Sequence, residues 1–369
     1  MTDRNFPAWA AGVLATALLI TGCATASNAN AQERIIAIGD LHGDYDAFEA
    51  LLLDAGLINK RGRWTGGETI LVQTGDVPDR GPESLKIIKR LQNLQKKAPR
   101  KGGKVITLVG NHEAMNVTGD LRYVHPGEYE AFADRNSRQR REAAYEANLE
   151  AIEAFYLEQD ATFSSISIRE KWFDATPLGK LEHQRAWAPD GDVGGWVANN
   201  PAVAIVGDSL FVHGGISTKY TAYSVNSMNV MTHEALNARD TAPTSILYDE
   251  MGPLWYRGHV RDVVDTQTTD PISEAPVDDE ITAPTLLQTK EIDLALTVFD
   301  IDRIVIGHTP ALSGITATHD GKIIQIDTGI AAYYGGTQSY LEIMDGVLIA
   351  HDNGVETLIT DQEAEIKTP

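Results

Sequence analysis

The 369-residue sequence contains a single cysteine, Cys23, so no disulfide can form within one chain and disulfides give no clue to its compartment. Basic residues are also scarce, because 31 Lys and Arg stand against 52 Asp and Glu, a net charge of −21. This balance argues against nucleic acid as a partner and against charge-driven binding to anionic lipid heads. The N-terminal apolar stretch, residues 8–20, is too short to span a bilayer, which takes about 20 residues.

The position of the cysteine points to export. The apolar stretch follows Arg4 and ends in Ile20-Thr21-Gly22-Cys23. This ending resembles a bacterial lipoprotein signal, in which the cysteine is lipidated and becomes the first mature residue. A lipid chain, rather than a basic patch, would then hold the protein to a membrane.

We therefore expect a signal peptide over residues 1–22, lipidation of Cys23 and a flexible tether over residues 23–33. The expected location is the bacterial cell envelope, in the periplasm. The outer membrane is favoured because Ala24, and not aspartate, follows the cysteine. A secretory signal cleaved within residues 26–31, or an uncleaved anchor, stays the alternative.

Four short sequence motifs, or words, rich in Gly, Asp, Asn and His are the strongest indication of function in the sequence. The first three each follow a short apolar run, over residues 35–38, 70–72 and 105–109, so each falls where a buried strand is expected to end. Ligands of α/β proteins collect at such strand ends. In chain order the words are Gly39-Asp40-Leu41-His42-Gly43, Gly75-Asp76-Val77-Pro78-Asp79-Arg80-Gly81, Gly110-Asn111-His112-Glu113 and His213-Gly214-Gly215, with Gly307-His308 downstream.

The residue types in these words suit a pair of divalent metal ions. Hydrolysis of a phosphate ester by two metals needs hard oxygen and imidazole ligands, one shared carboxylate, and ions about 3.5 to 4 Å apart. A single Gly-Asp at a strand end is more often a turn with a helix N-cap, but four words in one order argue against coincidence. The candidate ligands are Asp40, His42, Asp76, Asn111, His213 and His308.

The four words resemble those of the PPP-type metallophosphatases, the family of eukaryotic serine/threonine protein phosphatases within the calcineurin-like phosphoesterases. Residues 252–258, Gly-Pro-Leu-Trp-Tyr-Arg-Gly, and residues 210–216, Leu-Phe-Val-His-Gly-Gly-Ile, are most similar to the bacterial and plant Shewanella-like protein phosphatase branch. The resemblance spans about residues 34–340 and is weak through the middle of the chain.

The resemblance implies two metal positions that share one bridging carboxylate, Asp76. It assigns the first metal to Asp40, His42 and Asp76, and the second to Asp76, Asn111, His213 and His308. Manganese is the favoured metal, with iron and zinc as alternatives, because a mixed Asp, His and Asn set accepts all three.

The resemblance also implies the roles of the remaining site residues. His112 matches the general acid that protonates the leaving oxygen, and Asp79 matches the carboxylate that orients it. Arg80 and Arg257 match the arginines that bind phosphate oxygens, together with Asn111. The Trp-Tyr-Arg run around Arg257 can equally place an arginine against an aromatic face.

Two departures from the family pattern bear on these roles. Pro78 stands where valine is usual. Because proline fixes φ and lacks an N–H, we expect that Asp79 can be displaced from His112. Near the C-terminus, Asp327-Thr328-Gly329 and Tyr333-Tyr334 occupy the region of the aromatic loop of eukaryotic members. Whether either tyrosine faces substrate stays open.

The spacing of the words predicts the architecture. Helical patterns over residues 45–57 and 82–97 alternate with the apolar runs, which predicts βαβ units. The expected fold is α/β, a two-sheet β-sandwich flanked by helices with the four-layer arrangement of metallophosphoesterases. Further strands are expected over residues 202–206, 210–213, 303–306, 322–326 and 340–343.

The domain is expected over residues 34–350, followed by a tail over residues 351–369. A helical insertion is expected over about residues 119–200, in which the charged stretch 128–159 reads as one or two long helices. Residues 266–284, rich in Thr, Pro, Asp and Glu, are expected to form a mobile acidic loop.

These patterns predict a hydrolase of phosphomonoesters on phosphoproteins or phosphopeptides, acting through a hydroxide that bridges two metals, with phosphotyrosine slightly favoured over phosphoserine and phosphothreonine. A symmetrical dinucleoside tetraphosphate hydrolase or other nucleotide phosphatase shares the same words and is the alternative. A noncatalytic surface-anchored module on a decayed site is the third hypothesis, although every expected ligand is present. The sequence does not indicate the oligomeric state.

Overall fold

The computed structural model describes residues 34–261 and 285–359. The signal peptide, the tether and the lipidation site expected within residues 1–33 lie outside the described residues, as does the acidic loop expected over residues 266–284. Among the helices of the described ranges, none is both long and apolar enough to cross a membrane.

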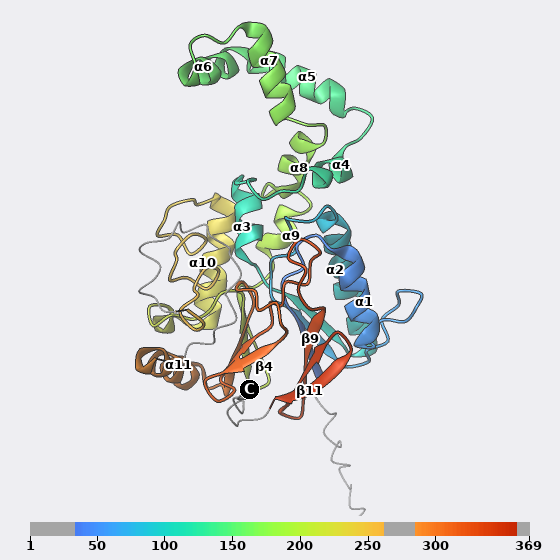
Figure 1. The fold of residues 1–369 in the computed structure, drawn as a ribbon, viewed down its shortest axis with the longest axis vertical. Helices are drawn as coiled ribbons and strands as arrows, with labels where there is room; N and C mark the ends of the chain where they lie inside the picture. Colours follow the sequence, from blue (N-terminus) through green and yellow to red (C-terminus); the bar gives the residue numbers. More distant parts are fainter. Residues whose placement is uncertain (1–33, 262–284, 360–369) are drawn as a thin grey trace, which may run out of the picture. The chain divides into compact units, whose positions relative to one another are not determined.

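Two mixed β-sheets form the centre of the described chain (Figure 1). The six-stranded sheet has the order β11-β10-β9-β1-β2-β3, and the five-stranded sheet has the order β4-β5-β6-β8-β7. Strands β1, β2 and β3 pair in parallel, as do β5, β6 and β8, and the other pairings are antiparallel. The strands are β1 (Arg34–Ile38), β2 (Ile70–Gln73), β3 (Lys104–Thr107), β4 (Val203–Val206), β5 (Ser209–Val212), β6 (Arg303–Ile306), β7 (Thr316–Thr318), β8 (Ile323–Gln325), β9 (Ser339–Met344), β10 (Val347–Asp352) and β11 (Val355–Ile359).

The parallel strands of the first sheet are joined by helices, because parallel neighbours need a crossover connection. Helix α1 (Tyr45–Asp54) begins where the side chain of Asp44 accepts a hydrogen bond from the N–H of Ala47 at 3.0 Å, an N-cap. Helix α2 (Ser84–Lys97) links β2 to β3. The expected βαβ units are present.

Side chains alternate between two cores along the strands. In β1, Ile35 and Ala37 pack with Phe211 and other strand residues of the second sheet, which places this core between the sheets. Ile36 instead belongs to the core shared with helices such as α1, where Phe48 is fully buried. This period-2 alternation defines a sandwich with helices outside it, and the expected fold class is confirmed.

The remaining helices are distributed over both halves of the chain. Helices α10 and α11 contribute Met228 and Ile292 to the same core as Leu210 of the second sheet. The helices are α3 (Asn111–Thr118), α4 (Pro126–Phe132), α5 (Ser137–Ala147), α6 (Leu149–Gln159), α7 (Ser165–Ala175), α8 (Lys180–Trp187), α9 (Gly194–Ala198), α10 (Val225–Ala238) and α11 (Leu286–Phe299), with 3₁₀ turns at Ala98–Lys101 and Tyr220–Ala222.

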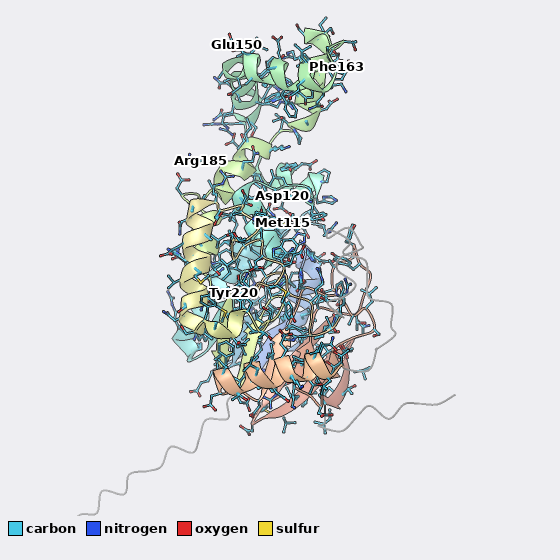
Figure 2. All side chains as sticks on the ribbon, turned by 90° about the vertical axis from the view of Figure 1, so that its left-hand side faces the viewer. Met115, Asp120, Glu150, Phe163, Arg185 and Tyr220 are labelled. Carbon is cyan, nitrogen blue, oxygen red and sulfur yellow. The ribbon has the colours of Figure 1, made fainter. Side chains whose placement is uncertain are left out.

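The charged stretch 128–159 forms parts of three helices, α4, α5 and α6, and the expectation of one or two long helices is wrong. The chain leaves helical geometry at Ala133 and again at Asn148 (φ −116°, ψ 15°). The turn at Asn148 lets Ile152 of α6 pack against Tyr145 and Ile168 in a small core of their own. Figure 1 shows α5, α6 and α7 away from both sheets, and Figure 2 labels Glu150 of α6 and Phe163 of the connection between α6 and α7 in this part of the chain.

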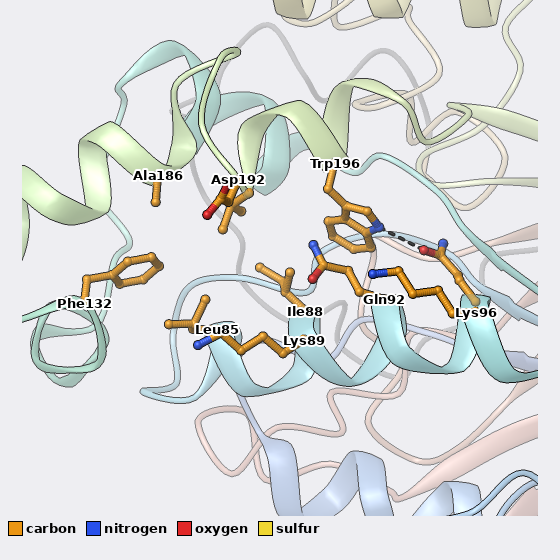
Figure 3. Close-up of a pocket in the computed structure, with 11 residues that line it drawn as sticks. Leu85, Ile88, Lys89, Gln92, Lys96, Phe132, Ala186, Asp192 and Trp196 are labelled. Carbon is orange, nitrogen blue, oxygen red and sulfur yellow. Dashed lines mark hydrogen bonds between the residues drawn. The ribbon is translucent and has the colours of Figure 1, made fainter.

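A cavity of about 570 Å³ separates part of α2 from the helical insertion (Figure 3). Leu85 and Ile88 of α2 form one wall, and Phe132 of α4 stands across from them. At one end Trp196 Nε1 donates a hydrogen bond to Gln95 Oε1 at 2.9 Å. The cavity lining contains none of the expected site residues.

The first sheet continues beyond residue 350, where the sequence suggested that the domain ends. That position lies inside β10, and β11 pairs with β10 from Val355 to Ile359. Strand β11 is exposed over most of its length, including Val355 and Leu358, so it lacks the buried alternation by which a strand is recognised.

Candidate metal centre

The topology brings the expected ligands together from both sheets. Asp40, Asp76 and Asn111 follow β1, β2 and β3, while His213 and His308 follow β5 and β6. All five strands belong to parallel pairings, so their carboxyl ends lie at common sheet edges.

Two glycines make this convergence possible. A Cβ at Gly110 would lie 2.2 Å from Asp76 Oδ1, and a Cβ at Gly307 would lie 2.4 Å from Asp40 Oδ1. Asp76 (φ 54°) and His308 (φ 68°) also adopt the left-handed region, which costs a non-glycine residue free energy and is maintained by surrounding contacts.

Asp76 lies at the centre of the site. Its Oδ2 is 3.2 Å from His213 Nε2 and 3.9 Å from His42 Nε2. Two groups have ligand atoms all within 4.8 Å of one another, and Asp76 belongs to both; they are His42, Asp76 and His112, and Asp76, His213 and His308. The geometry thus makes Asp76 the carboxylate that two ions could share.

Asp40 and Asn111 stand beside these groups. Asp40 Oδ2 is 4.0 Å from His42 Nε2 and accepts a hydrogen bond from the N–H of His308 at 3.1 Å. Asp40, expected with His42 and Asp76, is outside the first group, in which His112 takes its place. Asn111 Oδ1 is 2.8 Å from His213 Nε2.

The orientation of the imidazoles fits a cation. His42 Nδ1 lies 3.0 Å from the carbonyl oxygen of Pro78, and His213 Nδ1 lies 2.9 Å from that of Thr74. Because a carbonyl only accepts, both Nδ1 atoms donate, and in the neutral ring Nε2 carries a lone pair. His213 Nε2 therefore faces the oxygens of Asn111 and Asp76, and when the ring is neutral these three atoms are electron-pair donors that a metal ion satisfies.

His308 gives independent support. Its Nε2 is buried and has no hydrogen-bond partner among the described residues, which is costly unless a ligand occupies the position. Burial and the charge of Arg257 hold the pKa of His308 well below its usual value, so the ring is neutral and able to bind a metal.

The pKa values of the two aspartates shift in opposite directions. Burial raises the pKa of Asp40 well above its usual value, with repulsion from Asp327 and Asp76 adding to it. Burial acts in the same direction on Asp76, but His213 and His112 outweigh it and hold the pKa of Asp76 well below its usual value. Burial lowers the pKa of His42 to about 3.

His112 and Asp79 form a close pair. His112 Nδ1 lies 2.5 Å from Asp79 Oδ2, and Asn116 Nδ2 donates to Asp79 Oδ1 at 3.0 Å. Burial acts to lower the pKa of His112, but Asp76 and Asp79 outweigh it and the pKa is raised. The displacement of Asp79 considered possible because of Pro78 is absent.

Sequence reasoning missed the role of Glu113. Its buried carboxylate accepts hydrogen bonds from the N–H groups of Gly110 (2.8 Å), Asp76 (2.9 Å) and Val77 (2.8 Å), so it joins two of the motif words. Burial raises its pKa to about 7. The sequence feature that could have indicated this role is the position of Glu113 as the last residue of the Gly-Asn-His-Glu motif.

Asp327 is a second acidic residue that sequence reasoning placed in this region without a role. It is buried, and burial raises its pKa to about 6. Its Oδ1 accepts a hydrogen bond from the N–H of Gly329 at 3.0 Å. Repulsion between Asp327 and Asp40 is one reason that a cation would stabilise this side of the site.

The two expected phosphate-binding arginines sit in different surroundings. Arg257 Nη2 donates to the carbonyl oxygen of His308 at 3.3 Å, and burial lowers the pKa of Arg257 to about 10. No aromatic ring of the described residues stacks on its guanidinium. Arg80 does stack: its Cζ lies 3.9 Å from the ring centroid of Tyr123.

The chain belongs to the calcineurin-like phosphoesterase family, whose model matches residues 33–312. This defines it as a phosphoesterase of the metal-dependent kind and confirms the expected family. The donor set described above suits divalent metals.

Within that class the chain is similar to Shewanella-like protein phosphatase 2 of Arabidopsis thaliana, with 30% identity over 89% of this chain and 78% of the relative. Shewanella-like protein phosphatase 1 of Plasmodium berghei is 27% identical over 83% of this chain and 70% of its own length. The fold also matches the crystal structure of a cold-active protein-tyrosine phosphatase from a psychrophilic Shewanella species, with a TM-score of 0.63, 24% identity, and coverage of 89% and 80% of the two chains.

Proposed function

We propose that this protein hydrolyses phosphomonoesters on proteins or peptides, with phosphotyrosine slightly preferred. The observation that carries the proposal is the convergence of imidazole nitrogens on Asp76 Oδ2, with Asp40 against His42 and Asn111 against His213, next to the His112–Asp79 pair. The relatives named as protein phosphatases support a phosphoprotein substrate.

The proposed metal ligands are Asp40, His42 and Asp76 for one ion and Asp76, Asn111, His213 and His308 for the other. Two divalent ions bound there supply a nucleophilic hydroxide at neutral pH and neutralise charge on the phosphoryl group. Manganese is proposed as the metal, with iron or zinc accepted by the same donors.

The residues around the ligands have separate tasks. Arg80, Arg257 and Asn111 bind the phosphate oxygens, and Asn111 Nδ2 is a buried donor without a partner among the described residues. His112 donates a proton from Nε2 to the leaving oxygen, because its Nδ1 is held by Asp79. Burial acts to lower the pKa of His112, but Asp76 and Asp79 outweigh it, and the raised pKa favours the protonated form for this step.

The test is release of phosphate by purified protein in the presence of Mn²⁺. A phosphotyrosine peptide, a matched phosphothreonine peptide and a symmetrical dinucleoside tetraphosphate are compared, with Asp76→Asn as the control. Hydrolysis of either peptide that the control lacks supports the proposal, and faster turnover of the tyrosine peptide supports the preference. Turnover of the dinucleotide alone would replace it with the nucleotide hypothesis.

We also propose that the protein is exported and lipid-anchored through Cys23, which lies outside the described residues. The support is the Ile20-Thr21-Gly22-Cys23 ending of an N-terminal apolar stretch. Metabolic labelling with a fatty-acid analogue should tag the wild type and spare Cys23→Ser. Equal labelling of both proteins would refute the anchor.

A further inference from the structure

Arg80 is held differently from the other site residues. Its backbone is left-handed (φ 64°), a conformation that a non-glycine residue keeps only through external contacts. Its N–H donates to the carbonyl oxygen of Tyr123 at 3.1 Å, and its guanidinium carbon lies 3.9 Å from the centroid of the same ring. One residue, at the start of the helical insertion, therefore holds both the backbone and the side chain of Arg80.

Tyr123 acts through its ring. The phenol oxygen is buried and has no hydrogen-bond partner among the described residues. The ring also lies beside His112, with centroids 5.2 Å apart. A substitution that keeps the ring and removes the hydroxyl should therefore preserve every contact that the structure shows for this side chain.

A second ring, Tyr333, meets Arg80 from the loop between β8 and β9. The guanidinium carbon is 5.0 Å from its centroid, and Arg80 Nη1 donates to the phenol oxygen at 3.3 Å. Tyr333 is 61% exposed, and it contacts Tyr334 edge to face, with centroids 4.9 Å apart. Tyr334 in turn lies 5.3 Å from the ring of His42. This places an exposed aromatic surface between the phosphate-binding arginine and solvent.

We propose that Tyr123 is a positioning residue that orients the Arg80 guanidinium for phosphate, and that Tyr333 is a specificity-determining residue whose exposed ring contacts an aromatic leaving group. The proposal rests on the proposed function, because it takes Arg80 as a phosphate ligand.

The physical reason is preorganisation. A free arginine side chain loses much rotamer freedom when it binds phosphate, and a guanidinium already stacked on Tyr123 has lost most of that freedom beforehand. A phenyl ester bound at Arg80 also gains ring contact with Tyr333, which an aliphatic threonine ester cannot match.

Tyr123→Leu tests the positioning role, with Tyr123→Phe as its matched control. The leucine variant should raise KM for a phosphotyrosine peptide about 3- to 30-fold with little change in kcat. This rise in KM is the range expected from the loss of a cation–π contact. Its inhibition by orthophosphate should weaken by a similar factor. The phenylalanine variant should match the wild type in both measurements.

Tyr333→Ala tests specificity, with Tyr333→Phe as its control. Loss of the ring should lower the ratio of kcat/KM for phosphotyrosine over phosphothreonine peptides about 2- to 10-fold. The phenylalanine variant should keep that ratio, because it lacks only the hydrogen bond from Arg80. An unchanged ratio in the alanine variant would overturn the role of Tyr333.

The positioning role is overturned if Tyr123→Leu binds orthophosphate as tightly as the wild type, or if Tyr123→Phe is as impaired as Tyr123→Leu. Calorimetric binding of orthophosphate, phenyl phosphate and ethyl phosphate to Mn²⁺-loaded protein gives the same comparisons without turnover. A wild type that binds phenyl phosphate more tightly than ethyl phosphate but hydrolyses no phosphopeptide would refute the proposed function and leave the roles of Tyr123 and Tyr333 standing.

Discussion

At the candidate metal centre, buried polar side chains hold one another in place, whereas helices α5 to α7 of the insertion share a small core of three buried residues, with four partly buried aromatic side chains packed against it. The carboxylate of Glu113 alone accepts three backbone hydrogen bonds. The insertion relies on Tyr145, Ile152 and Ile168, and leaves Phe155 58% and Ile166 73% exposed. Elements with few buried contacts open at lower free energy, so the rigid site and the weakly packed insertion should respond to mutation separately.

The largest effect is expected at the shared carboxylate. Asp76→Asn keeps the shape of the side chain and removes its negative charge. His213 and His112 stabilise that charge, because they lower the pKa of Asp76 against the effect of burial. We expect kcat to fall at least about a thousandfold, because two-metal catalysis loses its common ligand. Because the substitution also removes the charged partner of two buried imidazoles, the melting temperature is measured alongside to separate loss of catalysis from loss of folding. Retained turnover would mean that Asp76 does not bridge two ions.

The insertion can be tested by truncating Ile168, the most deeply buried residue of its small core. Ile168→Ala should lower the free energy of local opening in α5, α6 and α7 by about 2–4 kcal/mol, and amide hydrogen exchange should accelerate there. Exchange in β1 to β3 and hydrolysis of p-nitrophenyl phosphate should stay within about twofold of the wild type. Leu52→Ala, equally buried in the main core, is the matched control and should destabilise the sheets instead. Loss of activity in Ile168→Ala would break the separation of the two regions.

The difference between the regions also explains what the sequence could predict. The candidate metal ligands stand in short words at strand ends, where local pattern and chemistry coincide, so Asp40, Asp76 and His213 were identifiable as candidates before their distances were known. The long-range partners were not. The contact of Tyr123 with Arg80 joins residues far apart in the chain, and no local sequence pattern predicts it. The break at Asn148 depends on the packing of Ile152, which a helical period does not encode.

Substitution of Glu113 tests how the rigid site is held together. Glu113→Gln replaces one acceptor oxygen with a donor that opposes the N–H groups of the motif words. We expect activity to fall about 10- to 100-fold and the free energy of unfolding to drop by about 1–3 kcal/mol. Denaturant titration beside steady-state kinetics measures both. If stability falls without any loss of activity, the alignment of Asp76 does not depend on Glu113.

The smallest expected effect concerns Glu128, which joins α4 of the insertion to α2 beside the first sheet. This buried residue of α4 accepts hydrogen bonds from the N–H groups of Ser84 (2.9 Å) and Leu85 (3.1 Å) at the start of α2. Burial raises its pKa from 4.5 to about 7, although those hydrogen bonds oppose the shift. A raised carboxyl pKa contributes stability that is fully present below pH 4.5 and is lost as the pH rises through about 7.

The test compares the wild type with Glu128→Gln by denaturant unfolding at pH 5 and pH 8. Groups common to both proteins cancel in the difference between them. Between these values the wild type should lose on the order of 1 to 2 kcal/mol more stability than the variant, because only its side chain must ionise in a buried site. Parallel profiles of stability against pH for the two proteins would show that the ionised Glu128 carboxylate is stabilised where α4 contacts α2. In that case ionisation of Glu128 would not contribute to the pH dependence of stability, and the hydrogen bonds from Ser84 and Leu85 would offset the cost of its burial.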